Sequence, residues 1–167
     1  MKAFLRLLAQ LALYLPFVAL IGYFSHAPRY AVLRPGEALV RLSFVHAAER
    51  KAPCRERSAA ELAKLAPNMR AALDCPRERA PLLVELEFDG AVVFRRTVPP
   101  AGLQHDGNAT VYHRLPVPAG RHRIVARLRD RAEGDFNYVR EATLDLSPGA
   151  ALLIDFIPAQ GGFVFRG

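Results

Sequence analysis

The stretch LLVELEFDGAVVFRRTV occupies residues 82–98 and decides how the rest of the chain can fold. Its first half places apolar side chains at every second position, namely Leu82, Val84, Leu86 and Phe88. Glu85 and Glu87 fall between them, and this period of two is typical of a strand with one buried face. Asp89 and Gly90 then favour a two-residue hairpin turn into residues 92–98. The stretch therefore predicts two antiparallel strands.

Similar short runs occur on both sides of this hairpin. They cover residues 40–44, 111–117, 122–128, 142–146, 150–156 and 163–165. Residues 118–120 (PAG) and 147–149 (SPG) supply the φ values that tight turns need. The run at 163–165 either adds a closing strand or presents a peptide that a partner captures by strand addition. Seven or eight short strands predict a mainly β fold, an antiparallel immunoglobulin-like β-sandwich.

Three of these segments also share a pattern with known modules. They are VELEFDG at 84–90, PAGRHRIVA at 118–126 and LSPGAALLI at 146–154. Together they resemble the PEGA-type and related immunoglobulin-like or transthyretin-like modules of bacterial envelope proteins, over residues 82–158. The resemblance implies a non-catalytic role in adhesion, spacing or partner binding. The chain departs from this pattern in its cysteine-containing insertion and in GDFNY at 134–138.

The N-terminal segment predicts membrane insertion. Residues 7–24 are interrupted only by Gln10 and Pro16, and Lys2 and Arg6 precede them. Eighteen helical residues span about 27 Å, close to the thickness of a bilayer's hydrocarbon core. The positive residues predict that the N-terminus stays in the cytoplasm. We therefore expect a single-pass protein of the inner (cytoplasmic) membrane with its C-terminal domain in the periplasm.

The expected domain organisation follows from this anchor. Residues 1–27 form an uncleaved anchor, 28–38 a linker, and 39–167 one extracytoplasmic β-sandwich, since about 140 residues suit a single domain. The alternative is a cleaved secretory signal, because SHA at 25–27 places small residues where a signal peptidase reads them.

An insertion at residues 47–81 interrupts the strand pattern. It contains the only two cysteines, Cys54 and Cys75, which we expect to form a disulfide outside the cytoplasm. In the chain-entropy model, closing this loop stabilises the fold by about 3 kcal/mol. Ser58 and Glu61 form a capping-box pattern that predicts a short helix from Ser58 to about Leu65. The insertion is either a binding loop or a cap over one open end of the sandwich.

The chain is basic, with 23 Lys and Arg against 16 Asp and Glu. Four arginines share the solvent side of one predicted strand and are candidate partner-binding residues: Arg121, Arg123, Arg127 and Arg129. Arg95, Arg96, Arg114 and Arg140 broaden the basic area. The four arginines either bind an acidic partner or lipid phosphate, or pair with Glu141 and Asp145 across a hairpin. No nucleic-acid-binding signature accompanies the charge, so no nucleic acid is expected.

The sequence contains no recognisable metal-binding or catalytic motif. The five histidines have no ligand-motif spacing, so we expect no metal site and no cofactor, with His46 as the weak metal candidate. The serines and the Glu85–Glu87 pair form no recognisable nucleophile or acid–base set, so we expect no enzyme. The predicted function is a membrane-anchored accessory or scaffold protein that binds another envelope protein or inner-membrane complex. The alternative is an extracytoplasmic copper or zinc assembly factor using His46 with the cysteines or Met69.

Overall fold

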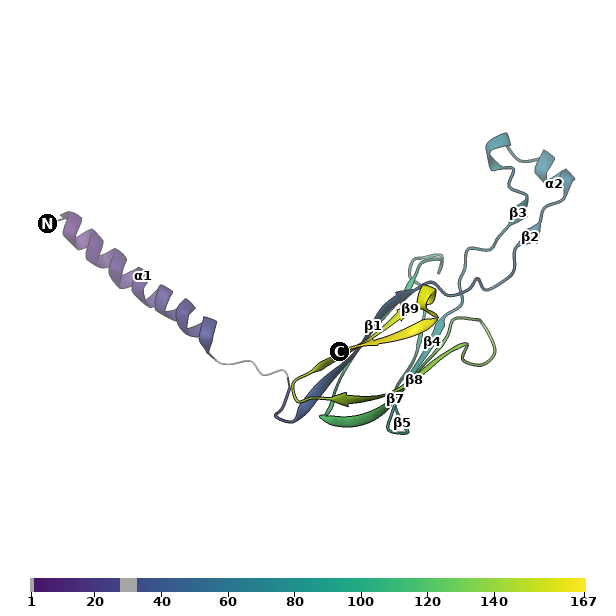
Figure 1. Cartoon of the computed structure of the whole chain (residues 1–167). Helices are drawn as coiled ribbons and strands as arrows, with labels where there is room; N and C mark the ends of the chain where they lie inside the picture. The colour runs from purple at the N-terminus through teal and green to yellow at the C-terminus, as the bar shows by residue number, and fades with distance from the viewer. Residues whose placement is uncertain (1, 28–32) are drawn as a thin grey trace. The chain divides into compact units, whose positions relative to one another are not determined.

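The computed structural model describes residues 2–27 and 33–167 and divides the chain into two compact units, residues 1–34 and 35–167. The first contains the helix α1 (Lys2–His26), drawn in purple in Figure 1. It is long and apolar enough to cross a membrane, with a mean hydropathy of 2.0 over its most apolar 18 residues. Length and composition alone would suit a signal sequence equally well, so both interpretations of this segment stay open.

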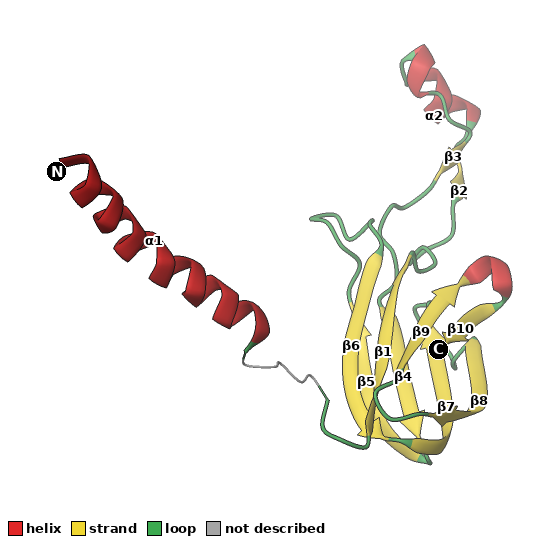
Figure 2. Ribbon diagram, turned by 60° about the vertical axis from the view of Figure 1, so that its left-hand side comes forward, coloured by secondary structure: helices red, strands yellow, loops and turns green. Residues whose placement is uncertain are grey.

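The second unit is built mainly from strands (Figure 2). One four-stranded sheet has the order β10-β9-β1-β6, and the other has the order β5-β4-β7-β8. The first sheet comprises β10 (Gly162–Arg166), β9 (Ala151–Ile157), β1 (Glu37–His46) and β6 (Ala109–Pro118). The second comprises β5 (Ala91–Val98), β4 (Leu82–Phe88), β7 (Gly120–Arg129) and β8 (Tyr138–Leu146). The mainly β fold predicted from the sequence is confirmed.

The β4–β5 hairpin forms where the sequence predicts it. Asp89 and Gly90 both have positive φ values, 50° and 85°, which is the conformation of a type I′ turn. Strand β4 pairs antiparallel with β5 on one side and with β7 on the other. The central position of β4 explains why its alternating pattern is the clearest in the chain.

One strand pair differs from the all-antiparallel prediction. Strand β1 pairs antiparallel with β6 but parallel with β9, in the register Arg41 opposite Leu153. Parallel neighbours need a long connection between them, and here the whole β5-β4-β7-β8 sheet lies between β1 and β9 in the sequence. The local residue pattern is the same for both directions, so it does not predict this pairing.

The two sheets enclose a single core. Each core strand contributes every second side chain, as at Val40, Leu42 and Phe44 of β1. The largest fully buried side chains come from both sheets: Leu42, Leu82, Leu86, Ile124, Leu128, Ile154, Val40, Val84 and Val111. Strand β10 closes the first sheet, and its Phe163 packs edge-on against Phe44 and Phe156, with ring centroids 5.8 and 5.2 Å apart. The C-terminal run is therefore a closing strand.

The core predicts how stability responds to truncation. Leu86→Ala removes a side chain that is 1% exposed, and we expect a loss of about 2–5 kcal/mol in the free energy of unfolding because a cavity remains. Leu103→Ala is the control, since Leu103 is 99% exposed and should change stability by less than about 0.5 kcal/mol. Urea denaturation of the full chain in detergent, followed by circular dichroism, measures both. Equal losses for the two variants would contradict the core assignment.

Candidate functional site

The insertion forms an arm that leaves one end of the sandwich (Figures 1 and 2). We define the arm as residues 50–79, because an isolated antiparallel β-bridge between Arg50 and Arg79 marks its base. It contains β2 (Arg55–Glu56), α2 (Ala59–Ala63), the 3-10 turn η1 (Pro67–Met69) and β3 (Leu73–Asp74). Within the 47–81 insertion only the two ends reach the core, through Ala48 and Ala80. No residue of the arm itself is buried, so residues 50–79 do not cover core side chains.

Backbone and side-chain contacts fix the base of the arm to the sandwich. The Glu49 amide donates to the Asp130 carbonyl over 2.9 Å, and Arg79 Nη1 donates to the Ala48 carbonyl over 2.7 Å. Lys51 Nζ lies 2.7 Å from Glu78 Oε1 across the two chains of the arm. These contacts set the direction in which the arm leaves the domain.

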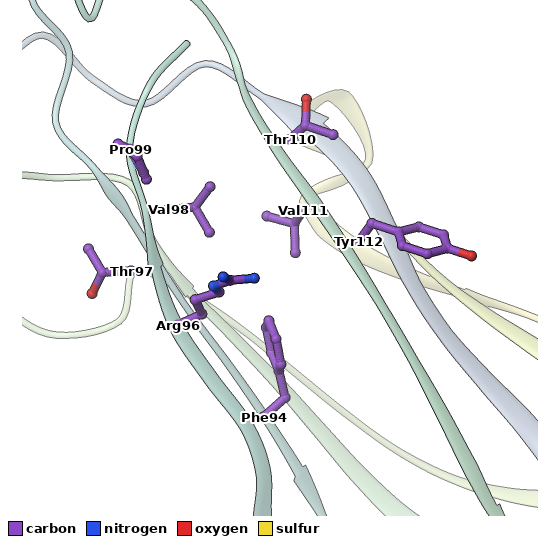
Figure 3. A pocket seen from close by; sticks show the side chains of 8 residues that line it. All are labelled: Phe94, Arg96, Thr97, Val98, Pro99, Thr110, Val111 and Tyr112. Atoms are coloured by element: carbon purple, nitrogen blue, oxygen red, sulfur yellow. The ribbon is translucent and has the colours of Figure 1, made fainter.

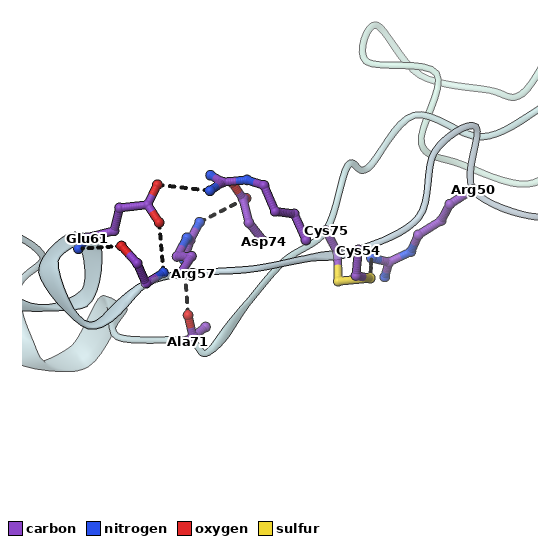
Figure 4. A network of polar contacts seen from close by, with 9 residues as sticks. Arg50, Cys54, Arg57, Glu61, Ala71, Asp74 and Cys75 are labelled. Carbon is purple, nitrogen blue, oxygen red and sulfur yellow. Dashed lines mark hydrogen bonds and ion pairs between the residues drawn. A yellow bond between two sulfur atoms is a disulfide. The ribbon is translucent and has the colours of Figure 1, made fainter.

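A disulfide braces the middle of the arm (Figure 4). Cys54 and Cys75 form the predicted bond and stand next to the β2–β3 pair, where Arg55 lies opposite Asp74. Arg55 and Arg57 both reach the Asp74 carboxylate, with N–O distances of 3.0 and 2.9 Å. The bond and the ion pairs together hold the two chains of the arm side by side.

The tip of the arm begins with the predicted capping box. The Ser58 hydroxyl accepts from the Glu61 amide, and the Glu61 carboxylate accepts from the Ser58 amide over 2.8 Å. The helix ends earlier than predicted, at Ala63, and the chain turns at Pro67. The Ser58 amide and the Arg55 guanidinium lower the pKa of Glu61 from 4.5 to about 2.

The surface of the arm is basic and partly apolar. Residues 50–79 contain eight Lys and Arg against four Asp and Glu. Lys64 and Arg77 are exposed and make no ion pair with the described residues. Met69 and Leu73 are 61% and 51% exposed. The arm thus offers positive charge beside apolar side chains.

Two of the four arginines on β7 form ion pairs with glutamates of the same sheet. Arg123 Nε lies 2.6 Å from Glu141 Oε1, and Arg127 lies 2.7 Å from both Glu85 and Glu87. The Arg123 hydrogen bond also lowers the pKa of Glu141. The Arg123–Glu141 pair is part of the cross-strand alternative to partner binding, whereas the pairs of Arg127 with Glu85 and Glu87 were not expected and Asp145 forms no ion pair with the described residues.

The other two arginines have no carboxylate partner among the described residues. Arg121 is exposed, and its register partner Asp145 makes no ion pair with it. Arg129 Nη1 donates to the Gly134 carbonyl over 2.9 Å. The four arginines therefore do not act as one uncompensated stripe.

His46, the weak metal candidate, takes part in a hydrogen-bond network at the base of the arm. Its Nε2 donates to Asp130 Oδ2 over 2.8 Å, and Asn137 Nδ2 donates to Asp130 Oδ1 over 2.7 Å. Asp130 is only 4% exposed, so its carboxylate needs these partners. The sequence analysis missed Asp130 and Asn137, because no local motif links them to His46.

The described residues contain no group of three or more His, Cys, Asp or Glu side chains placed to hold a metal ion. His122 contacts Asp89 Oδ2 and the Pro118 carbonyl with its two ring nitrogens, at 2.6 and 2.9 Å. His113 stacks on Phe94 with a centroid distance of 4.5 Å. These two rings and His46 lie in separate packed or hydrogen-bonded environments.

A cleft of about 270 Å³ lies between the edge strands β5 and β6 (Figure 3). Apolar side chains of Phe94, Val98 and Val111 line it, together with Arg96 and Tyr112. The lining contains no carboxylate, histidine or thiol. Such a cleft suits an apolar side chain of a bound segment, with Arg96 and Tyr112 as hydrogen-bond donors.

No protein-family model, no curated protein and no solved structure matches this chain.

The arm predicts an unusual response to loss of the disulfide. In C54S/C75S, we expect the unfolding free energy of the sandwich to fall by less than about 1 kcal/mol, well below the about 3 kcal/mol of the loop-closure model. The reason is that the arm buries nothing, so it can loosen while the core stays folded. Limited proteolysis should cut residues 55–74 faster, whereas the 99–108 loop should be cut at an unchanged rate. Cooperative loss of the whole domain would contradict this independence.

The capping box predicts a local acid transition. The lowered pKa of Glu61 means that its contribution is fully present above pH 4.5 and is lost as the pH falls through about 2. The protection of the amides of residues 58–65, measured as exchange relative to the intrinsic rate at each pH, should therefore fall in that window. Glu61→Gln keeps the capping acceptor without a titrating group and should show a flat profile. An equal acid response in E61Q would assign the transition to another group.

Proposed function

We propose that this protein is a membrane-anchored, non-catalytic accessory protein whose domain binds another envelope protein or membrane complex through the arm. One observation carries the proposal. The arm is held in shape by a disulfide, a capping box and ion pairs, yet contributes no buried residue to the core. A segment that is braced without supporting the fold is well suited to recognition.

The bracing itself favours binding. Ordering a flexible segment on contact with a partner costs about 0.5–1.5 kcal/mol for each immobilised side chain, and a preformed arm avoids part of that cost. Asp74 holds Arg55 and Arg57 in fixed positions before any partner arrives. The arm can therefore present one fixed surface.

The chemistry of the arm indicates the chemistry of its partner. Lys64 and Arg77 offer positive charge that no described acidic residue pairs with, and Met69 and Leu73 offer exposed apolar area. An acidic protein surface that includes an apolar depression complements both features.

The location we propose is the periplasmic face of the inner membrane. Helix α1 is long and apolar enough for an anchor, and a disulfide is typical of proteins outside the cytoplasm. We also infer that the two sheets form an immunoglobulin-like module, supported by their common core and their Greek-key-like strand order.

The test is co-purification from native membranes with a tag after the exposed Gly167, with partners identified by mass spectrometry. We expect K64E/R77E to reduce recovery of the partner by roughly tenfold, because both substitutions place like charges against an acidic surface. R121E is the control, since it reverses the charge of one exposed arginine on β7, outside the arm. Loss with R121E alone would assign binding to β7, and recovery of the protein without a partner would refute the proposal.

A further inference from the structure

Three arginines form a row across the outward face of the β10-β9-β1-β6 sheet. Arg114 of β6 is the register partner of Arg41 of β1, Arg41 is the partner of Leu153 of β9, and Leu153 is the partner of Arg166 of β10. Neighbouring strands lie about 4.8 Å apart, so the row extends over about 14 Å. We call Arg41, Arg114 and Arg166 the arginine row.

No carboxylate of the described residues forms an ion pair with the arginine row. Asp155 of β9 lies on the same face, two residues from Leu153, and accepts a hydrogen bond from the Phe156 amide instead. All three side chains are exposed, and none takes part in an ion pair with the described residues. The opposite sheet is different, because its row runs Arg95, Glu85 and Arg127 with alternating sign. Like charges directly opposite each other destabilise a strand pair, so Arg41 and Arg114 repel each other until an anion lies between them.

The neighbours of the row suit a membrane surface. Tyr112 and Val45 are each 56% exposed on the same face; Tyr112 lies two residues from Arg114 on β6, and Val45 lies four residues from Arg41 on β1. A tyrosine ring with a polar tip is favoured at the level of lipid headgroups. Arginine pairs with phosphate through two parallel hydrogen bonds.

We propose that the arginine row binds the anionic phospholipid headgroups of the membrane in which α1 is anchored. Its length of about 14 Å exceeds one phosphate group, so it faces several headgroups. Nine residues, 28–36, lie between Ala27 and Glu37, and the chain across them spans at most about 35 Å, a length compatible with contact between the sheet and that surface. The proposal shares with the proposed function only the membrane anchor, because the row and the arm are different surfaces.

The test places the full chain in lipid nanodiscs of phosphatidylcholine, with or without phosphatidylglycerol. Phenylglyoxal modifies accessible arginines, and mass spectrometry gives the rate at each position. Three arginines near an anionic surface raise the equilibrium constant for contact by about a hundredfold. We therefore expect the modification rate of the row to be at least about tenfold lower with phosphatidylglycerol than without it. Arg121, exposed on the other sheet, is the internal control. Ionic strength near 1 M should remove the protection, because screening shortens to about 3 Å.

A second measurement separates lipid contact from other causes. Lipids with spin-labelled headgroups should broaden the NMR signals of Tyr112 and Val45 in the wild type but not in R41Q/R114Q/R166Q. K64E/R77E should keep this broadening even if it loses a protein partner, so failure of either proposal is recognised independently of the other.

Three outcomes would overturn the lipid proposal. The first is an equal modification rate in both kinds of nanodisc. The second is protection by inorganic phosphate alone, without lipid, which would indicate an isolated anion site. The third is protection only in native membranes that retain a protein partner, which would assign the row to an acidic protein surface.

Discussion

Each main sheet of the domain has one apolar face, and the other sheet is what covers it. Leu86 and Leu128 on one side and Leu42 and Ile154 on the other are almost fully buried, so the two sheets depend on each other for stability. Because successive side chains of a strand point to opposite faces, the residues between the core positions point outward. The polar chemistry of the protein is therefore confined to the two outward faces, the turns and the arm.

The two outward faces differ in how their charged side chains are paired, and this difference follows from the burial of Glu85. Glu85 points outward from β4 yet is only 6% exposed, because β4 lies inside its sheet with strands on both sides. A carboxylate with so little water needs cationic partners, and Arg127 and Arg95 supply them at 2.7 and 3.4 Å. The two acids of β4 thus compensate the arginines at the centre of the β5-β4-β7-β8 face. Arg121 and Arg129 at the ends of β7, like the three arginines of the opposite sheet, make no ion pair with the described residues.

Much of the fold could be predicted from the sequence, because local rules determine it. Alternation located the strands, Asp89 and Gly90 located the hairpin, and Ser58 and Glu61 located the helix start. The parallel β1–β9 pair could not be predicted, since a period of two does not encode strand direction. The arginine row was missed for the same reason, because Arg41, Arg114 and Arg166 become neighbours only through the register of four strands. The basic run on β7 was visible, but its acidic partners on β4 were not connected to it.

An anchor changes what strength a binding surface needs. A domain on a short tether experiences the membrane surface at an effective concentration of about 1 mM. A binding free energy of only about 4 kcal/mol is then enough for half of the domains to be bound. The binding free energy that three exposed arginines or the arm can supply is too small for stable association of a free domain at low concentration. In the anchored protein that we propose, the same surfaces would be sufficient to orient the domain, and this orientation would decide which partners the arm can reach. Both proposals therefore depend on the proposed anchoring by α1, because surfaces of this size need the high effective concentration that an anchor gives.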